Sequence, residues 1–184
     1  MNKILIANRG EIAVRIIRAC KEMNIKTVAV YSEIDKDALH TKLADEAICI
    51  GPALPGKSYL NIKNIIEAAC ITGADSLHPG FGFLSENSQF AKICEESNIK
   101  FIGPVSKVID LLGNKSNAKE MMKKEGIPVI PGSNGSVKSS KEAVDIAKEI
   151  GYPVILKAAA GGGGKGIRIA NNKQELEDNY NIVK

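Results

Sequence analysis

Residues 3–32 read KILIANRGEIAVRIIRACKEMNIKTVAVYS and are the most informative part of the chain about its fold class. The β-branched runs 3–7 and 27–31 predict two strands. Between them, apolar residues recur at helical spacing over 11–23, which predicts a helix with Asn24 as its C-cap. Four residues are expected to form its buried face: Ile12, Ile16, Ala19 and Cys20. Strands that alternate with a helix of this length indicate a parallel sheet.

The alternation continues through the first hundred residues. The further strands are expected at 47–50, 75–77 and 100–102, and the further helices at 37–44, 60–72 and 86–97. Such an order places helices on both faces of one parallel sheet, because each crossover returns over the sheet in the same hand. The sequence therefore predicts a Rossmann-like α/β domain over residues 1–113.

The pattern changes after Gly103. Strands are expected at 154–158 and 167–170, joined by a glycine-rich loop, and helices at 106–112, 115–125, 141–150 and 174–180. The two strands predict an antiparallel hairpin. One hairpin and its helices bury little apolar surface. We therefore expect residues 114–184 to be the incomplete start of a second, α+β domain.

Composition and charge exclude several classes of protein. Hydrophobic residues make up 44% and charged residues 25%, which is typical of globular proteins and not of disordered, collagen-like or coiled-coil chains. No apolar run approaches the ~18 residues of a membrane helix. The start, MNKILIANRG, has no signal-peptide cleavage pattern, so a cytoplasmic location without membrane contact is expected.

The charge distribution points to an anionic ligand in the second half. Residues 100–184 carry 14 basic and 9 acidic side chains, against 11 and 12 in residues 1–99. The net charge of +4 is modest, and no basic stripe is interleaved with aromatic residues, so nucleic acid is not expected as a partner. With only two histidines we expect no metal site. The four cysteines are expected to be buried, reduced thiols: Cys20, Cys49, Cys70 and Cys94.

The strongest local motif is VILKAAAGGGGKGIRI at 154–169. Consecutive glycines expose backbone N–H groups that can close over phosphate oxygens, and Lys157 adds a fixed positive charge beside them. The Walker pattern fails, because Ala159 and Gly166 occupy its first glycine and its Ser/Thr. A Rossmann loop requires a helix to follow, and a kinase loop has its lysine after the glycines. A flexible linker or a solvated turn is the plainer alternative.

A second motif, HPGFGFLSEN at 78–87, follows a strand at the edge where open α/β sheets bind ligands. Its plainer interpretation is structural: Ser85 caps the next helix, Glu86 lies in the first turn of that helix, and Phe81 and Phe83 fill the core. The first strand-to-helix turn contains only Gly10, so NAD binding is not expected.

Four motifs belong together: ILIANRGEIA at 4–13, HPGFGFLSEN at 78–87, GNK at 113–115 and KAAAGGGGKGIR at 157–168. In this order they resemble the biotin carboxylases, which are ATP-grasp enzymes. The resemblance runs over the whole chain and corresponds to the N-terminal part of the catalytic unit. It implies the first half-reaction of acetyl-CoA carboxylase: ATP phosphorylates bicarbonate to carboxyphosphate, and the carboxyl group is transferred to biotin on a carrier protein.

The resemblance also implies site residues. Lys115 and Lys157 would contact the ATP phosphates, Gly163 and Gly164 would close over them, and Glu86 would face the reaction centre. Biotin is the carrier-bound substrate, and most ligands of Mg²⁺ would lie outside this chain, so the isolated chain is expected to be inactive. The family usually has Tyr where this chain has Phe81, so a hydroxyl contact is missing.

The partners implied by the resemblance are a biotin carboxyl carrier protein, carboxyltransferase subunits and a second copy of the chain. The homodimer would form through Arg15, Arg18 and Glu22, although these residues are equally typical of a solvated helix face. Other interpretations stay open. They are the biotin carboxylase part of a pyruvate or other acyl-CoA carboxylase, another ATP-grasp ligase resembling carbamoyl-phosphate synthetase, and a non-catalytic interaction module.

Overall fold

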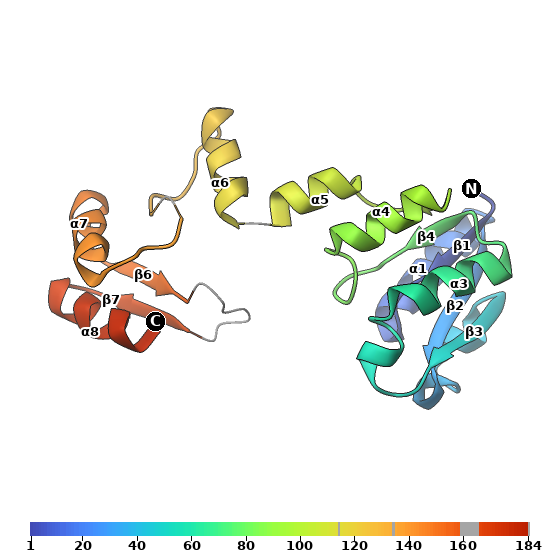
Figure 1. The fold of residues 1–184 in the computed structure, drawn as a ribbon. Coiled ribbons are helices and arrows are strands. Elements are labelled where there is room, and N and C mark those ends of the chain that lie inside the picture. Colours follow the sequence, from blue (N-terminus) through green and yellow to red (C-terminus); the bar gives the residue numbers. More distant parts are fainter. Residues whose placement is uncertain (114, 134, 159–165, 184) are drawn as a thin grey trace. The chain divides into compact units, whose positions relative to one another are not determined.

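The computed structural model describes residues 1–113, 115–133, 135–158 and 166–183. The chain divides into two units, Met1–Gly113 and Asn114–Lys184. In the first unit, five parallel strands form one sheet in the order β3-β2-β1-β4-β5 (Figure 1). The strands are β1 (Lys3–Ile6), β2 (Lys26–Ser32), β3 (Glu46–Gly51), β4 (Ser76–His78) and β5 (Lys100–Phe101). The predicted parallel α/β sheet is confirmed.

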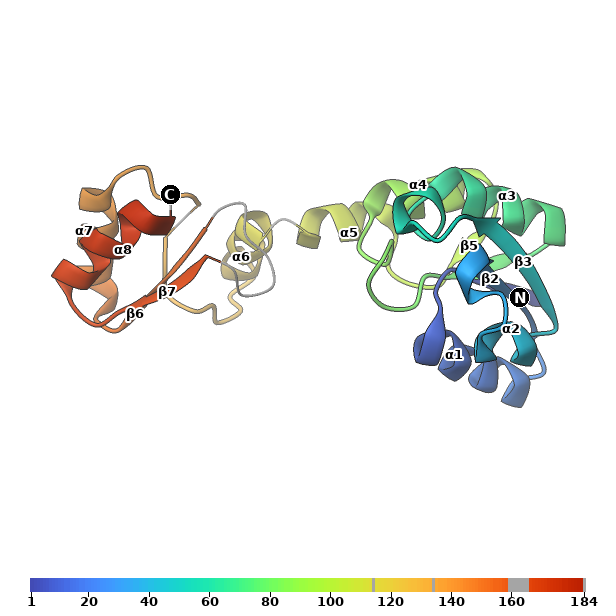
Figure 2. The same cartoon turned by 90° about the horizontal axis from the view of Figure 1, so that it is seen from below.

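Helices cover both faces of this sheet (Figure 2). One face is covered by α1 (Gly10–Glu22) and α2 (Leu39–Leu43), the other by α3 (Ile62–Thr72) and α4 (Ser88–Glu96). Side chains alternate along β1, so Ile4 and Ile6 pack towards α1 whereas Leu5 packs towards α3 and α4. Helix α5 (Ser106–Gly113) packs against α4, and two short 3₁₀ turns, η1 (Glu33–Asp35) and η2 (Pro55–Lys57), lie in the connections.

Helix α1 buries a different stripe from the predicted one. The buried residues are Ala13, Val14, Ile17 and Cys20. Of the predicted face only Cys20 is buried; Ile12 and Ile16 are half-buried at its margin and Ala19 is exposed. Both stripes are apolar, and the small Ala13 side chain lets the helix approach Ile4 and Ile6 of β1. Asn24 has a left-handed backbone, with φ of 55°, one residue beyond the C-cap residue Met23.

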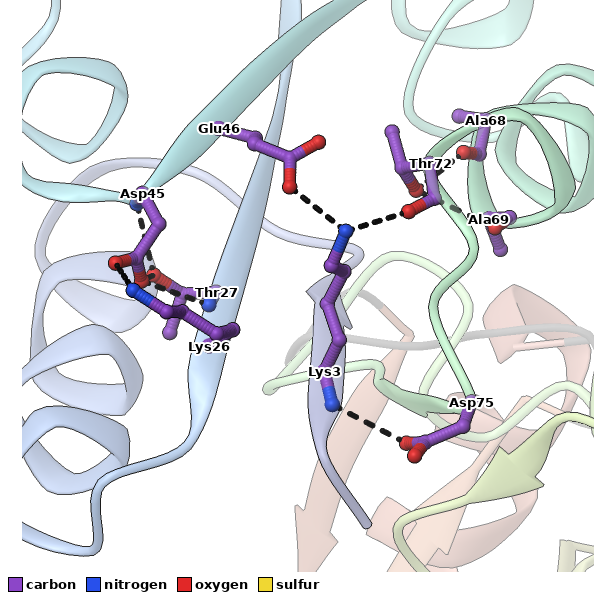
Figure 3. Close-up of polar contacts among 9 residues, drawn as sticks. All are labelled: Lys3, Lys26, Thr27, Asp45, Glu46, Ala68, Ala69, Thr72 and Asp75. Atoms are coloured by element: carbon purple, nitrogen blue, oxygen red, sulfur yellow. Dashed lines mark hydrogen bonds and ion pairs between the residues drawn. The ribbon is translucent and has the colours of Figure 1, made fainter.

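The amino-terminal edge of the sheet is held by polar contacts (Figure 3). The carboxylate of Asp45 accepts hydrogen bonds from Thr27 N at 2.9 Å and Thr27 Oγ1 at 2.8 Å. The Asp45 carboxylate also pairs with Lys26 at 3.1 Å. These contacts, first of all those from Thr27, lower the pKa of Asp45 to about 2. Lys3 bridges two further elements through Thr72 O at 2.8 Å and Glu46 at 2.7 Å.

The second unit contains the predicted hairpin. Strands β6 (Val154–Lys157) and β7 (Ile167–Ala170) pair antiparallel, and the helices are α6 (Lys115–Lys124), α7 (Ser140–Ile150) and α8 (Lys173–Val183). Helices α7 and α8 pack on one face of the hairpin (Figure 1). Its core is formed by Ala143, Val144, Ala147, Ala170 and Leu176. Within the described ranges, no helix has the length and apolar character needed to cross a membrane.

All four cysteines are free thiols, but they are not all buried. Cys20 and Cys94 are buried as predicted, whereas Cys49 and Cys70 are exposed. Cys49 lies on β3, the edge strand that only β2 pairs, and Cys70 lies on the outer side of α3. The prediction of four buried thiols was therefore wrong for these two, because apolar surroundings in sequence do not reveal which side of an element faces solvent.

Candidate functional site

The hairpin of the second unit has a face that its helices leave uncovered. Ile155 lies opposite Ile169 in the strand register, and Lys157 lies opposite Ile167. Because side chains alternate along a strand, these four share the face turned away from α7 and α8. The exposed fractions are 60% for Ile155, 40% for Ile167 and 58% for Ile169. The result is an apolar surface with the exposed Lys157 at one end.

Sequence reasoning identified Lys157 but missed the three isoleucines. The signal that could have found them is the alternation itself: in a hairpin with helices on one face, every second residue belongs to the other face. Arg168, opposite Leu156 in the register, lies on the helix-covered side. The structure therefore separates Lys157 from Arg168, although both basic residues flank the same loop in sequence.

The base of the glycine loop is closed by Ala158 and Gly166. The amide of Ala158 donates to the Gly166 carbonyl at 3.0 Å. Gly166 has φ of +80°, and a Cβ atom there would lie 2.8 Å from the Cβ of Ala158, so this position requires glycine. The predicted phosphate-binding residues Gly163 and Gly164 lie outside the described residues. Of Lys115, the structure describes only its place as the first residue of α6.

A second group of residues gathers at the carboxyl edge of the parallel sheet. The chain leaves β1 towards one side and β4 towards the other, so the connections after these two neighbouring strands diverge there. Such a switch point is where open α/β sheets bind ligands. Asn8 follows β1, and its Nδ2 donates to the carbonyl oxygens of Pro79 and Phe81, both at 2.9 Å. The turn after β1 is thereby joined to the HPGFGFLSEN loop.

The structure corrects the plainer interpretation of that loop. Asn87, not Ser85, caps α4: its side chain accepts from Phe90 N at 2.8 Å. Ser85 lies in the preceding turn, where its amide donates to Gly82 O at 2.9 Å. Glu86 precedes the helix and is exposed. The helix begins two residues later than predicted because the turn extends through Glu86 and inserts the buried Leu84 into the core.

The two phenylalanines of the loop have different environments. Phe81 is 77% exposed, so the prediction that it fills the core was wrong. Phe83 stacks on Tyr59 with ring centroids 5.1 Å apart and planes at 11°. Arg9, Asp35, Phe81 and Phe83 line an open hollow of about 470 Å³.

Asp35 is the polar centre beneath this hollow. Its Oδ2 accepts from Tyr59 OH at 2.7 Å, from Ser32 Oγ at 2.9 Å and from Arg9 at 3.3 Å. Burial by itself would raise the pKa of Asp35. The three hydrogen bonds and the positive charge of Arg9 have the larger effect, so the pKa of Asp35 lies below its usual value. Burial and the bond to Asp35 raise the pKa of Tyr59 to about 12. The pair is therefore a carboxylate and a neutral phenol at neutral pH.

Two further predictions concern metal and partner sites. In the described part of the chain, no three His, Cys, Asp or Glu side chains lie together as a metal site would require. Arg15, Arg18 and Glu22 are exposed on α1, on the side away from its buried stripe.

Comparison with known proteins decides the family. The family described as "Biotin carboxylase, N-terminal domain" matches residues 1–109. The chain belongs to the biotin carboxylase family. Residues 114–183 match the family "Carbamoyl-phosphate synthase L chain, ATP binding domain". The predicted family and its ATP-grasp region are thus confirmed.

Biotin carboxylases of several bacteria are similar over the whole chain. Biotin carboxylase 1 of Bacillus subtilis is 58% identical over 183 residues, which is 100% of this chain and 41% of that protein. The biotin carboxylase–β,γ-ATP complex from Campylobacter jejuni has a TM-score of 0.90 and 56% identity, and covers 99% of this chain and 41% of that one.

A third relative is a biotin carboxylase domain from another type of carboxylase. The domain of Hydrogenobacter thermophilus 2-oxoglutarate carboxylase, crystallised as a dimer with MgADP, ADP and bicarbonate, has a TM-score of 0.88 and 56% identity. It covers 99% of this chain, which covers 40% of that domain. The chain spans about two fifths of the length of these biotin carboxylase relatives.

Proposed function

We propose that this chain is the N-terminal part of an enzyme that uses ATP and bicarbonate to carboxylate biotin on a carrier protein. Family membership supports the reaction class, and two similar structures hold MgADP with bicarbonate and a β,γ-ATP ligand, respectively. In this reaction ATP phosphorylates bicarbonate, and the resulting carboxyphosphate supplies the carboxyl group for biotin.

The observation that carries the proposal is the uncovered face of the β6–β7 hairpin. Ile155, Ile167 and Ile169 offer an apolar surface on which a purine base can pack, and Lys157 stands at the end of that surface. A lysine ammonium binds phosphate oxygens and offsets their charge, and phosphoryl transfer is catalysed mainly by such positioning and charge stabilisation. A contiguous exposed apolar surface is typical of ligand-binding grooves and of interaction faces.

The other predicted residues have proposed roles of their own. Lys115 would contact the phosphates, and Gly163 and Gly164 would cover them with backbone N–H groups. Glu86, exposed at the carboxyl edge of the sheet, would face the reaction centre. Magnesium would neutralise the phosphates in the complete enzyme. We assign no step of the chain's own chemistry to the metal.

The first test compares two lysine variants in a full-length enzyme that contains these residues. Lys157→Gln keeps much of the side-chain length but loses a charge-assisted contact, which costs about 1.5–3 kcal/mol of ATP binding. We expect a KM for ATP raised by about tenfold or more, with an unchanged melting temperature. Lys141→Gln, an exposed lysine on α7, is the matched control and should leave the KM unaltered. Equal kinetics for both variants would refute the phosphate role.

A second variant tests the apolar surface separately from the charge. Ile155→Thr keeps the branched Cβ that suits a strand but replaces the ethyl group by a hydroxyl on the proposed base-binding face. We expect weaker ATP binding with little loss of stability, because Ile155 is 60% exposed. An unchanged dissociation constant for ATP would show that the nucleotide does not use this face.

The 184-residue chain itself is expected to be inactive. It carries Lys157 but only one wall of the proposed nucleotide cleft, and phosphoryl transfer requires that water be excluded. With magnesium, bicarbonate and free biotin, phosphate release should be absent for this chain and present for one completed to the length of its relatives. Comparable turnover by both would contradict the proposal.

The substrate of the complete enzyme has several candidates. Our first choice is that the complete enzyme belongs to an acetyl-CoA carboxylase. The alternative is a pyruvate, 2-oxoglutarate or other acyl-CoA carboxylase, and the similarity to the Hydrogenobacter thermophilus 2-oxoglutarate carboxylase domain supports considering it. The match of residues 114–183 to a carbamoyl-phosphate synthase domain keeps a third candidate, an ammonia-dependent ligase. Biotin-dependent ATP cleavage that ammonia does not replace would exclude that third candidate.

The proposed partners are a biotin carboxyl carrier protein, carboxyltransferase subunits and a second copy of the chain. The homodimer would use the exposed face of α1 that carries Arg15, Arg18 and Glu22. Charge reversal by Arg18→Glu should then shift a full-length enzyme from dimer to monomer in sedimentation. An unchanged dimer would assign these residues to an ordinary solvated face.

A further inference from the structure

The loop 79–87 is fastened to the sheet by a buried amide. Asn8 is 1% exposed, and both N–H bonds of its carboxamide are used, because Nδ2 donates to Pro79 O and to Phe81 O at 2.9 Å each. Its Oδ1 accepts from Arg9 N, also at 2.9 Å. The amide thus holds the loop backbone on both sides of Gly80. A buried amide with every group satisfied fixes its partners in one arrangement.

A second anchor holds the same loop through aromatic rings. Tyr59 is 1% exposed and stacks on Phe83. The guanidinium carbon of Arg9 lies 5.5 Å from the Tyr59 ring centroid and 5.9 Å from that of Phe83, within the range of cation–π attraction. Asp35 fixes both of these neighbours, since it accepts from Tyr59 OH and from Arg9.

The anchored loop displays residues that the fold itself does not need. Phe81 is 77% exposed, although its carbonyl is held by Asn8. Glu86 is exposed, although it lies between the buried Leu84 and the helix-capping Asn87. An exposed phenylalanine on a rigidly held backbone adds little to the core. A loop held in one arrangement keeps the aromatic ring and the carboxylate in a fixed geometry, as the orientation of a reactant requires.

We propose that Asn8, Arg9, Asp35 and Tyr59 are positioning residues for the reaction, and that they act by holding loop 79–87 so that Phe81 and Glu86 have fixed places at the carboxyl edge of the sheet. This inference rests on the proposed function, because it assumes that Glu86 faces the reaction centre. The four residues come from three different connections of the sheet, after β1, β2 and β3, and they act on the connection after β4.

The anchoring is tested in the 184-residue chain by hydrogen exchange of the loop amides. Asn8→Asp is nearly isosteric but replaces two donated hydrogen bonds by repulsion between a carboxylate and two carbonyl oxygens. We expect the amides of Gly80, Ser85 and Asn87 to exchange about tenfold faster or more. Thr27→Val is the matched control: Thr27 is also fully buried in this sheet, but its hydroxyl bonds Asp45 at the opposite edge. Equal exchange in both variants would refute the anchoring.

The positioning role is tested by kinetics in a full-length enzyme. Asn8→Asp should lower kcat for bicarbonate-dependent ATP cleavage by about tenfold or more and leave the KM for ATP unchanged, because the proposed ATP contacts lie on other residues. Tyr59→Phe keeps the stack on Phe83 and loses only the hydroxyl, so it should show a smaller loss of the same kind. Tyr59→Phe also provides the kinetic test if Asn8→Asp does not fold.

A double variant separates positioning from general destabilisation. If Asn8 acts through Glu86, the variant Asn8→Asp/Glu86→Gln should be no slower than the slower of the two single variants. Additive losses, or an unchanged kcat for Asn8→Asp, would refute the positioning role. Absence of bicarbonate-dependent cleavage in the unsubstituted enzyme would instead refute the proposed function, and this inference with it.

Discussion

Gly80 lies so close to Asn8 that a Cβ atom on the glycine would be 2.6 Å from Nδ2 of the asparagine. The Cβ and Cγ of Asn8 would each be 2.9 Å away, so rotation of the amide alone does not relieve the contact. Gly80 also has φ of +66°, a conformation that favours glycine. The close approach explains why this loop has a glycine directly beside its buried anchor.

Gly80→Ala is therefore expected to lower the free energy of unfolding by about 2–3 kcal/mol, from backbone strain together with the displaced Asn8. Gly82→Ala is the matched control, because Gly82 has φ of +71° but nothing within 4 Å of the added atom. Its loss should be limited to the backbone strain of about 1 kcal/mol. Urea denaturation measures both, and equal losses would contradict the close packing against Asn8.

Replacing the cap of α4 distinguishes the observed helix start from the predicted one. Asn87→Ala removes the bond to Phe90 N and should cost about 1 kcal/mol of stability. Ser85→Ala should cost less, because no contact of the Ser85 side chain with the first turn is seen in the described structure. If urea titrations showed a larger loss of stability for Ser85→Ala than for Asn87→Ala, the helix would begin where the sequence predicted it.

The Asp45–Thr27 contact predicts acid sensitivity. The pKa of Asp45 falls from 3.8 to about 2 on folding, so its stabilisation is complete above pH 3.8 and is lost as the pH falls through about 2. Because the side chain is 30% exposed, we expect the contribution to be about 1 kcal/mol after solvent screening.

Urea midpoints measured from pH 5 down to pH 2 test this contribution. Asp45→Asn removes the titrating group, so its stability should fall less steeply over this range than that of the unsubstituted chain. Thr27→Val removes the hydroxyl donor and should give an intermediate slope, since the backbone amide of Thr27 still donates. Parallel curves for all three proteins would show that Asp45 does not contribute.

The cysteines should separate into two classes by reactivity. Cys49 and Cys70 are exposed and should react with a disulfide reagent in the native chain. Burial raises the pKa of Cys94 to about 12 and also raises that of Cys20, so both should react only after unfolding. The double variant Cys49→Ser/Cys70→Ser should show no fast phase. A fast phase that persists in this variant would mean that the buried thiols are reached through native-state opening.

Local sequence patterns were sufficient to predict the class of the fold and the hairpin. Period-two and period-3.6 apolar patterns are local, so the parallel α/β order and the strands on either side of the glycine loop followed from them. Lys157 was predicted to bind phosphate in the same way, since a strand-end lysine beside consecutive glycines is typical of a phosphate-binding loop and lies within one short segment. The loop 78–87 was predicted to lie at a ligand-binding edge because it follows a strand.

Other features depend on long-range packing, which selects one of several arrangements that the local sequence allows equally. Two apolar stripes compete on α1, and packing against Ile4 and Ile6 selects the one that contains Ala13. Ser85 and Asn87 are both suitable N-cap residues for α4. Because Leu84 is buried in the core, the turn extends through Glu86 and Asn87 becomes the cap. The Asp35–Tyr59 contact joins residues that are 24 positions apart in the sequence. Asp35 follows β2 and Tyr59 follows β3, and the two residues meet because these parallel strands end at the same edge of the sheet. Long-range contacts of this kind leave no periodic trace in the sequence, because they depend on strand order rather than on local spacing.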